Sequence, residues 1–127
     1  MALYSNPSTD RPNCESRHMS VGEVCKQKLQ NFVTFIATFT PPIYAHDLAK
    51  LTVEVDNLDS LKATFFVAQL VDGKESIIEK RDFTALCDSD IPDNVKVFLN
   101  EAIIPNTECH DKFWRYLDLF AKLTNSN

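Results

Sequence analysis

Glycine is nearly absent from this sequence. Of its 127 residues only Gly22 and Gly73 are glycines. Loops that bind phosphate through their backbone, and the dinucleotide-binding folds that use such loops, need several closely spaced glycines. A β-sandwich needs many tight turns, in which glycine supplies the positive φ angles. The composition therefore disfavours all three kinds of structure.

The sequence also lacks a long apolar segment. No run approaches the roughly 20 apolar residues that a membrane-spanning helix needs, and residues 1–20 contain no apolar stretch of the kind found in secretory signals. We therefore expect an intracellular protein of the cytoplasm or nucleus, with no membrane partner. In such a reducing compartment the cysteines are expected to be thiols; they are Cys14, Cys25, Cys87 and Cys109.

Clusters of basic residues are missing as well. The net charge is −5, and the lysines and arginines are dispersed along the chain. Proteins that bind nucleic acids usually carry a basic patch, so we expect an acidic protein with no nucleic-acid partner. The length and the ordinary balance of 44% hydrophobic and 24% charged residues suit one globular domain.

The first ordered element is predicted at Ser20. Residues 1–19 are rich in Ser, Asn, Pro and Arg without periodicity, which is typical of a flexible arm. Ser20 and Glu23 then form the signature of a capping box, and apolar residues follow at helical spacing until Pro41. We expect a long N-terminal helix here, in a single domain that spans residues 20–124.

The middle of the chain is interpreted as a sheet. Leu61–Val71 is apolar at successive positions, so its side chains would be apolar on both faces of a central strand. Leu51–Asp56 alternates and predicts a neighbouring strand. Asp72-Gly73 predicts a two-residue type I′ hairpin turn, after which Lys74–Lys80 would return as a charged edge strand. A fourth strand over residues 81–86 is left open.

Two amphipathic helices are predicted to close the chain. Asp90 or Ser89 would cap the first, whose apolar stripe is Val95, Phe98, Leu99, Ala102 and Ile103. Thr107 would cap the second, whose stripe is Phe113, Tyr116, Leu117 and Phe120. The predicted fold class is therefore α+β. An N-terminal helix precedes an antiparallel meander of three to four strands, and the two C-terminal helices pack on the sheet.

This order of elements, from Ser20 to Leu123, resembles that of the RWD and ubiquitin-conjugating superfamily. Cys87 follows the predicted strands, about where a conjugating enzyme carries its cysteine. The His-Pro-Asn segment expected before that cysteine is missing, and so is the tyrosine–proline motif of RWD domains. The resemblance therefore implies a fold and says little about activity.

No group of residues forms the pattern of a catalytic or metal site. Cys109-His110-Asp111 holds the residue types of a thiol-protease triad, but consecutive residues on a helix project about 100° apart and cannot meet. Cys14, His18 and Cys25 could supply zinc ligands, but no Cys-x2-Cys pair accompanies them. We expect no enzyme activity, no metal and no other cofactor.

The leading functional hypothesis is a non-enzymatic module for protein–protein interaction, either an adaptor or a subunit of a complex. A few helices cover one face of a short sheet more easily than both faces. An uncovered patch around Phe66, Leu70 and Ile77 would then bind a protein partner or a second copy, which would make the chain a homo-oligomer through its sheet.

Two other functions stay open at this point. A small apolar ligand could be carried between the sheet and the helices, in a space lined by Phe32, Phe35, Phe65 and Trp114. A cysteine-dependent enzyme could use Cys87 or Cys109 as its nucleophile.

Overall fold

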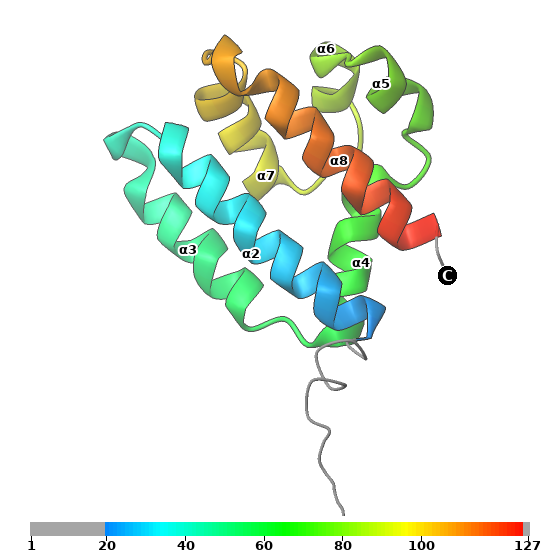
Figure 1. The fold of residues 1–127 in the computed structure, drawn as a ribbon. Coiled ribbons are helices and arrows are strands. Elements are labelled where there is room, and N and C mark those ends of the chain that lie inside the picture. Colours follow the sequence, from blue (N-terminus) through cyan, green and yellow to red (C-terminus); the bar gives the residue numbers. More distant parts are fainter. Residues whose placement is uncertain (1–19, 126–127) are drawn as a thin grey trace, which may run out of the picture.

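The computed structural model describes residues 20–125, and helices make up most of this part of the chain (Figure 1). The longer helices are α2 (Val21–Phe39), α3 (Ala45–Asp56), α4 (Ser60–Val71) and α8 (His110–Asn125). The shorter elements are η2 (Pro42–Tyr44), α5 (Glu75–Lys80), α6 (Phe83–Cys87), α7 (Asp93–Phe98), the π-helical η3 (Leu99–Ile103) and η4 (Thr107–Cys109). The arm predicted for residues 1–19 lies outside the described residues.

The predicted α+β fold is wrong. No residue between 20 and 125 belongs to a strand, so this part of the chain has neither the meander nor the order of elements that resembled the RWD and ubiquitin-conjugating superfamily. The three segments interpreted as strands are α3, α4 and α5.

The helical form of α4 follows from which of its residues are buried. They recur at i, i+3, i+4, i+7 and i+8, the spacing of one face of a helix, and are Ala63, Phe66, Val67, Leu70 and Val71. Asp59 caps the helix, because its carboxylate accepts a hydrogen bond of 2.8 Å from the amide of Lys62. The apolar run suggested a strand covered on both faces. It contains this buried helical stripe and further apolar residues on other sides of the helix.

The alternation in Leu51–Asp56 also fits a helix. Leu51 and Val55 are four residues apart, a spacing that a strand and a helix both place on one face, and both are buried in α3. Val53, which a strand would place on the same face as those two, is 58% exposed.

Asp72-Gly73 forms a turn, as predicted, but of another type and between two helices. Asp72 has φ −67° and ψ 127°, Gly73 has φ +73°, and the amide of Lys74 donates to the carbonyl of Val71 at 3.1 Å. These angles belong to a type II turn, in which only the second central residue needs positive φ. The chain continues into α5 and not into an edge strand.

The predictions for the amphipathic ends of the chain are confirmed in their main features. In α2 the Ser20 hydroxyl accepts from the amide of Glu23, and the Glu23 carboxylate accepts from the amide of Ser20. The apolar stripe predicted from Val95 to Ile103 is buried in α7 and η3. Its cap was predicted wrongly, since Pro92 precedes the first turn and no side chain caps it.

The last helix carries its predicted stripe but not its predicted cap. Phe113, Leu117 and Phe120 are buried in α8, and Tyr116 is half-buried. Thr107, expected to cap this helix, instead begins η4.

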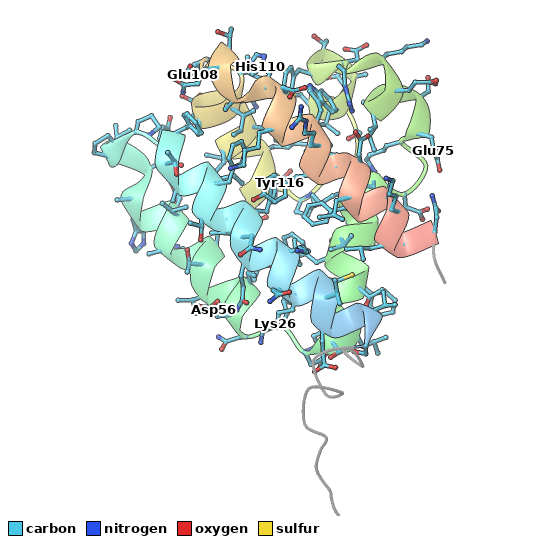
Figure 2. The ribbon with its side chains drawn as sticks, in the orientation of Figure 1. Lys26, Asp56, Glu75, Glu108, His110 and Tyr116 are labelled. Carbon is cyan, nitrogen blue, oxygen red and sulfur yellow. The ribbon has the colours of Figure 1, made fainter. Side chains whose placement is uncertain are left out.

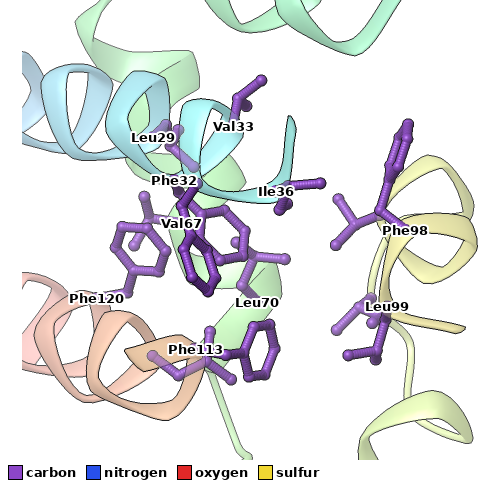
Figure 3. Packing of buried hydrophobic residues seen from close by; sticks show 14 of the residues in the cluster. Leu29, Phe32, Val33, Ile36, Val67, Leu70, Phe98, Leu99, Phe113 and Phe120 are labelled. Carbon is purple, nitrogen blue, oxygen red and sulfur yellow. The ribbon is translucent and has the colours of Figure 1, made fainter. Parts of the chain in front are cut away.

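The core forms where α4 meets α2 and α8, which pack on its inner face (Figure 1). Phe32 of α2 stands at the centre, with its ring centroid 5.9 Å from that of Phe113, 5.3 Å from Tyr116 and 5.5 Å from Phe120 (Figure 3). Such tilted and edge-on aromatic pairs stabilise a core beyond the area they bury. None of the helices in the described part is long and apolar enough to cross a membrane.

Arg81 attaches α5 to α8. It has a left-handed conformation with φ +54°, and its guanidinium donates to both carboxylate oxygens of Asp118, at 3.1 and 2.9 Å. The guanidinium also lies 5.8 Å from the centre of the Trp114 ring. The hydrogen bonds that Arg81 donates to Asp118 raise the pKa of Arg81.

At Gly22, α2 lies very close to the start of α4. A Cβ atom on this residue would lie 2.6 Å from the Cβ of Ser60 and 2.8 Å from its backbone carbonyl carbon. We expect Gly22→Ala to destabilise the protein by about 1–3 kcal/mol, because the backbone of α4 must move to make room. The free energy of unfolding in urea measures the effect.

An ordinary glycine inside a helix behaves in the opposite way, since replacement by alanine stabilises a helix by up to about 1 kcal/mol. A Gly22→Ala protein as stable as the wild type would therefore contradict the close approach. Gly73→Ala is the matched variant without a clash: a Cβ there meets nothing within 4 Å, and only the positive φ opposes it.

Candidate functional site

The outer side of α4 carries a second apolar stripe. Leu61 is 64% exposed and Phe65 is 60% exposed, and half-buried Ala68 continues the same face one turn further along. These three residues, spaced i, i+4 and i+7, are called the outer stripe below. The other large exposed apolar side chains in the described residues come one each from η2, α3 and α7, namely Ile43, Val53 and Val97. The outer stripe therefore stands out as two large apolar side chains on one helical face.

An open hollow of about 560 Å³ lies beside the C-terminal part of the outer stripe. Its lining residues come from the end of α4, the following turn and the segment before α7: Phe65, Ala68, Gln69, Asp72, Lys74 and Asp90. Phe65 and Ala68 make part of its wall apolar, and the remaining residues make the rest of the wall polar. The hollow can accept a bulky side chain from outside.

Lys74 holds the polar wall in place. The residue is 4% exposed, and its ammonium donates to the carbonyls of Gln69 at 3.1 Å and Asp72 at 3.3 Å. A third hydrogen bond of 2.8 Å goes to the carboxylate of Asp90. All three donors are satisfied, as a buried ammonium requires, and the cation lies at the C-terminal end of α4, where the helix dipole favours it.

The two ends of the outer stripe have opposite charge. Lys62 lies beside the beginning of the stripe, because it is the residue after Leu61 and is rotated from it by about 100° about the axis of α4. At its end lie Asp72, which is exposed, and Asp90, whose side chain is 90% exposed. The hydrogen bond from Lys74 lowers the pKa of Asp90, so this carboxylate stays ionised at neutral pH. The surface is apolar in the middle, basic at one end and acidic at the other.

A second hollow, of about 400 Å³, lies between α2 and α8. Tyr116 stands between these helices, and Glu108 lies near the start of α8 (Figure 2). Its apolar lining includes half-buried Phe39 and Tyr116. Phe35 is only 6% exposed, and the ammonium of Lys112 lies 5.5 Å from the centre of its ring. This groove lies at the edge of the aromatic core, and its walls include residues that also pack that core.

The residues of the predicted interaction patch do not form one surface. Phe66 and Leu70 are 7% and 2% exposed and face the core from the inner side of α4. Ile77 is half-buried on α5. The patch was placed on the uncovered face of a sheet, and the described residues contain no sheet.

The residues grouped for an apolar carrier are also separated. Phe32 and Trp114 are buried in the aromatic core beside Phe35, whereas Phe65 points outward from α4. The hollow inside the core, between Phe32 and its neighbours from α4, α7 and α8, has a volume of about 10 Å³. That is the space of about one water molecule and too small for an organic ligand.

The two cysteines considered as nucleophiles are thiols with structural contacts. Burial raises the pKa of Cys109, and its thiol donates to the carbonyl of Asn106 at 3.0 Å. Burial and the nearby Asp88 raise the pKa of Cys87, and its thiol donates to the side-chain carbonyl of Asn100 at 3.4 Å. A raised pKa lowers the thiolate fraction, and the thiolate is the reactive form.

His110 does not act on Cys109 either. Its Nε2 lies 2.9 Å and 3.0 Å from the carbonyl oxygens of Ile103 and Ile104, so the ring donates to the end of η3. Figure 2 places His110 at the first turn of α8, beside that end. Among residues 20–125 no three His, Cys, Asp or Glu side chains gather to hold a metal ion. Cys14 and His18 lie outside this range.

Comparison with protein-family models, with curated proteins and with solved structures finds no match to this chain. A functional interpretation therefore depends on the surface alone. The outer stripe was missed in the sequence because a strand places Leu61 and Phe65 on one face and Ala68 on the other. The spacing of Leu61, Phe65 and Ala68, beside a separate buried stripe at helical spacing, is the signal that identifies it.

The contact between Lys74 and Asp90 predicts a pH dependence of stability. The folded protein lowers the pKa of Asp90 below its ordinary value of 3.8. The contact therefore stabilises the fold above that value, and its contribution is lost as the pH falls through the lower folded-state pKa. We expect the wild type to be more stable than Asp90→Asn between about pH 5 and pH 8, with the difference shrinking below about pH 4.

Urea unfolding at a series of pH values measures this difference. Glu79→Gln, which neutralises an exposed acid on α5, is the matched control and should show no such convergence with the wild type. A difference between the wild type and Asp90→Asn that persists undiminished to about pH 2 would show that the carboxylate charge is not the source of the stabilisation.

Proposed function

We propose that this protein is a non-enzymatic interaction module, an adaptor or a subunit of a complex, and that the outer stripe of α4 is its docking surface. The observation that supports the proposal most directly is the exposure of Leu61 and Phe65, 64% and 60%, on one face of the central helix. A helix needs one apolar face to pack into a core, and α4 has a buried face for that purpose.

Within residues 20–125, the second face contributes no large side chain to the buried core. Its large side chains point away from the core that α2 and α8 form with the inner side of α4. Burying a leucine or phenylalanine side chain fully stabilises a complex by about 1.5–3 kcal/mol relative to leaving it exposed. An apolar centre with charged ends is also the usual composition of a docking surface.

Photo-crosslinking tests the docking surface. Benzoylphenylalanine placed at Phe65 should form covalent adducts with another protein molecule, in the purified protein or in an extract of its native cells. The same group at Ile43, which is 82% exposed on η2, is the matched control and should form far fewer. Adducts at Phe65 should be suppressed by an excess of wild-type protein and not by an excess of Phe65→Glu. Equal or absent adducts at both positions would contradict the proposed function.

A pair of neighbouring substitutions separates binding from folding. We expect Phe65→Glu to change the free energy of unfolding by less than about 1 kcal/mol, because its side chain lies outside the core. Phe66→Glu, at 7% exposure, should cost more than about 3 kcal/mol or prevent folding, since it buries a carboxylate among apolar residues. Urea unfolding at low protein concentration measures both. Comparable destabilisation by the two variants would show that Phe65 serves the fold.

A further inference from the structure

We propose that the outer stripe binds a second copy of this chain. The two α4 helices lie antiparallel, and the twofold axis passes between them at a height along the helix midway between Phe66 and Val67. The inference is built on the proposed function and names the partner. A twofold axis brings the same surface of both copies together, so the surface must complement itself. Three features of the outer stripe fulfil this requirement.

The first feature is the size of the side chains. An axis at this position sets Phe65 of one copy opposite Ala68 of the other, so that the large ring meets the small methyl group. The hollow beside Ala68, about 560 Å³ in volume, gives the ring room to enter. The same exchange happens at the symmetry-related place, and packing of large against small side chains is how facing helices interdigitate. The axis also sets Leu61 of each copy opposite Asp72 of the other, at the edge of the contact.

The second feature is charge. In the antiparallel arrangement Lys62 at the basic end of one stripe lies next to Asp72 at the acidic end of the other, and this pair occurs twice. Asp90 lies at the same end, where its carboxylate is paired with the ammonium of Lys74. The two antiparallel helix dipoles also attract each other, because the N-terminus of each α4 lies beside the C-terminus of the other α4.

The third feature is the failure of the alternative arrangement. Parallel helices would place Phe65 on Phe65 and leave the hollow beside Ala68 unfilled. They would also bring Lys62 next to Lys62, and Asp72 next to Asp72. Like charges and mismatched sizes both disfavour this pairing.

The dimer is expected to be weak and sensitive to ionic strength. One helical face is smaller than the ~800 Å² that each partner buries in a standard interface, so the two copies should associate weakly. Each copy carries a net charge of −5, which opposes association over long distances. Salt at about 0.15 M shortens the Debye length to about 8 Å and reduces this repulsion more than it weakens contact pairs.

Sedimentation equilibrium of the full chain in about 0.15 M salt, up to about 0.5 mM protein, tests for the dimer under these conditions. We expect the wild type and Ile43→Glu to shift from monomer to dimer over this range. Phe65→Glu should stay monomeric throughout. A wild type that stays monomeric, or a dimer that survives Phe65→Glu, overturns the proposal.

Charge exchange tests the antiparallel register. Lys62→Glu and Asp72→Lys should each weaken self-association at least tenfold, because each creates two pairs of like charge. A mixture of the two variants should form a heterodimer, since both pairs then have opposite charge again. Lys50→Glu and Glu79→Lys make the same charge changes on exposed residues of α3 and α5 and should leave the dimer unchanged.

Mixing Lys62→Glu with Asp72→Lys also tests how the two α4 helices are aligned. If the two variants dimerise no better together than apart, the antiparallel pairing is overturned even when a dimer exists. A monomeric wild type that still crosslinks from position 65 to a different protein overturns the second copy as partner and leaves the proposed function intact. A monomeric wild type without crosslinks at that position overturns both.

Discussion

Burial of the inner face of α4 is the interaction on which the rest of the structure depends. α2 and α8 both pack against this face, and they contact each other through the ring of Phe32 and the aromatic residues of α8. Gly22 sets how closely α2 can approach, because its missing side chain leaves room for the backbone of Ser60. The shorter helices add buried residues such as Ile78 and Leu86 to this core. Arg81 binds Asp118 of α8, and His110 of α8 binds the end of η3.

The amphipathic ends of the chain could be predicted from the sequence, and the middle could not. In α2 and α8, polar residues separate the apolar ones, so only a helical period puts the apolar residues on one face. In α4 too few polar residues interrupt the run to distinguish a period of 3.6 from a strand covered on both sides. In α3 the spacing of Leu51 and Val55 fits either structure. Asp72-Gly73 indicated a turn, and neighbouring helices can use such a turn as well as strands can.

The candidate site could also be predicted only in part from the sequence. The sequence indicated that Leu61–Val71 is central and apolar on more than one side, and both properties hold for α4. Which side faces inward depends on the secondary structure, because a strand and a helix distribute Phe65, Phe66 and Leu70 differently. Phe66 and Leu70 were therefore expected on the surface, and Phe65 beside a ligand within the protein. The hollow at Lys74 and Asp90 joins segments distant in the sequence, which no local pattern could indicate.

The position of α8 in the sequence has a consequence for synthesis. α4 is complete at Val71, but the helix that covers much of its inner face begins only at His110. While the intervening residues are being made, the inner face of α4 lacks part of its final cover, and exposed apolar surface of this kind is prone to aggregation. On a polysome, neighbouring copies expose the same helix at the same time. Premature pairing of α4 through its inner face would then compete with the arrival of α8.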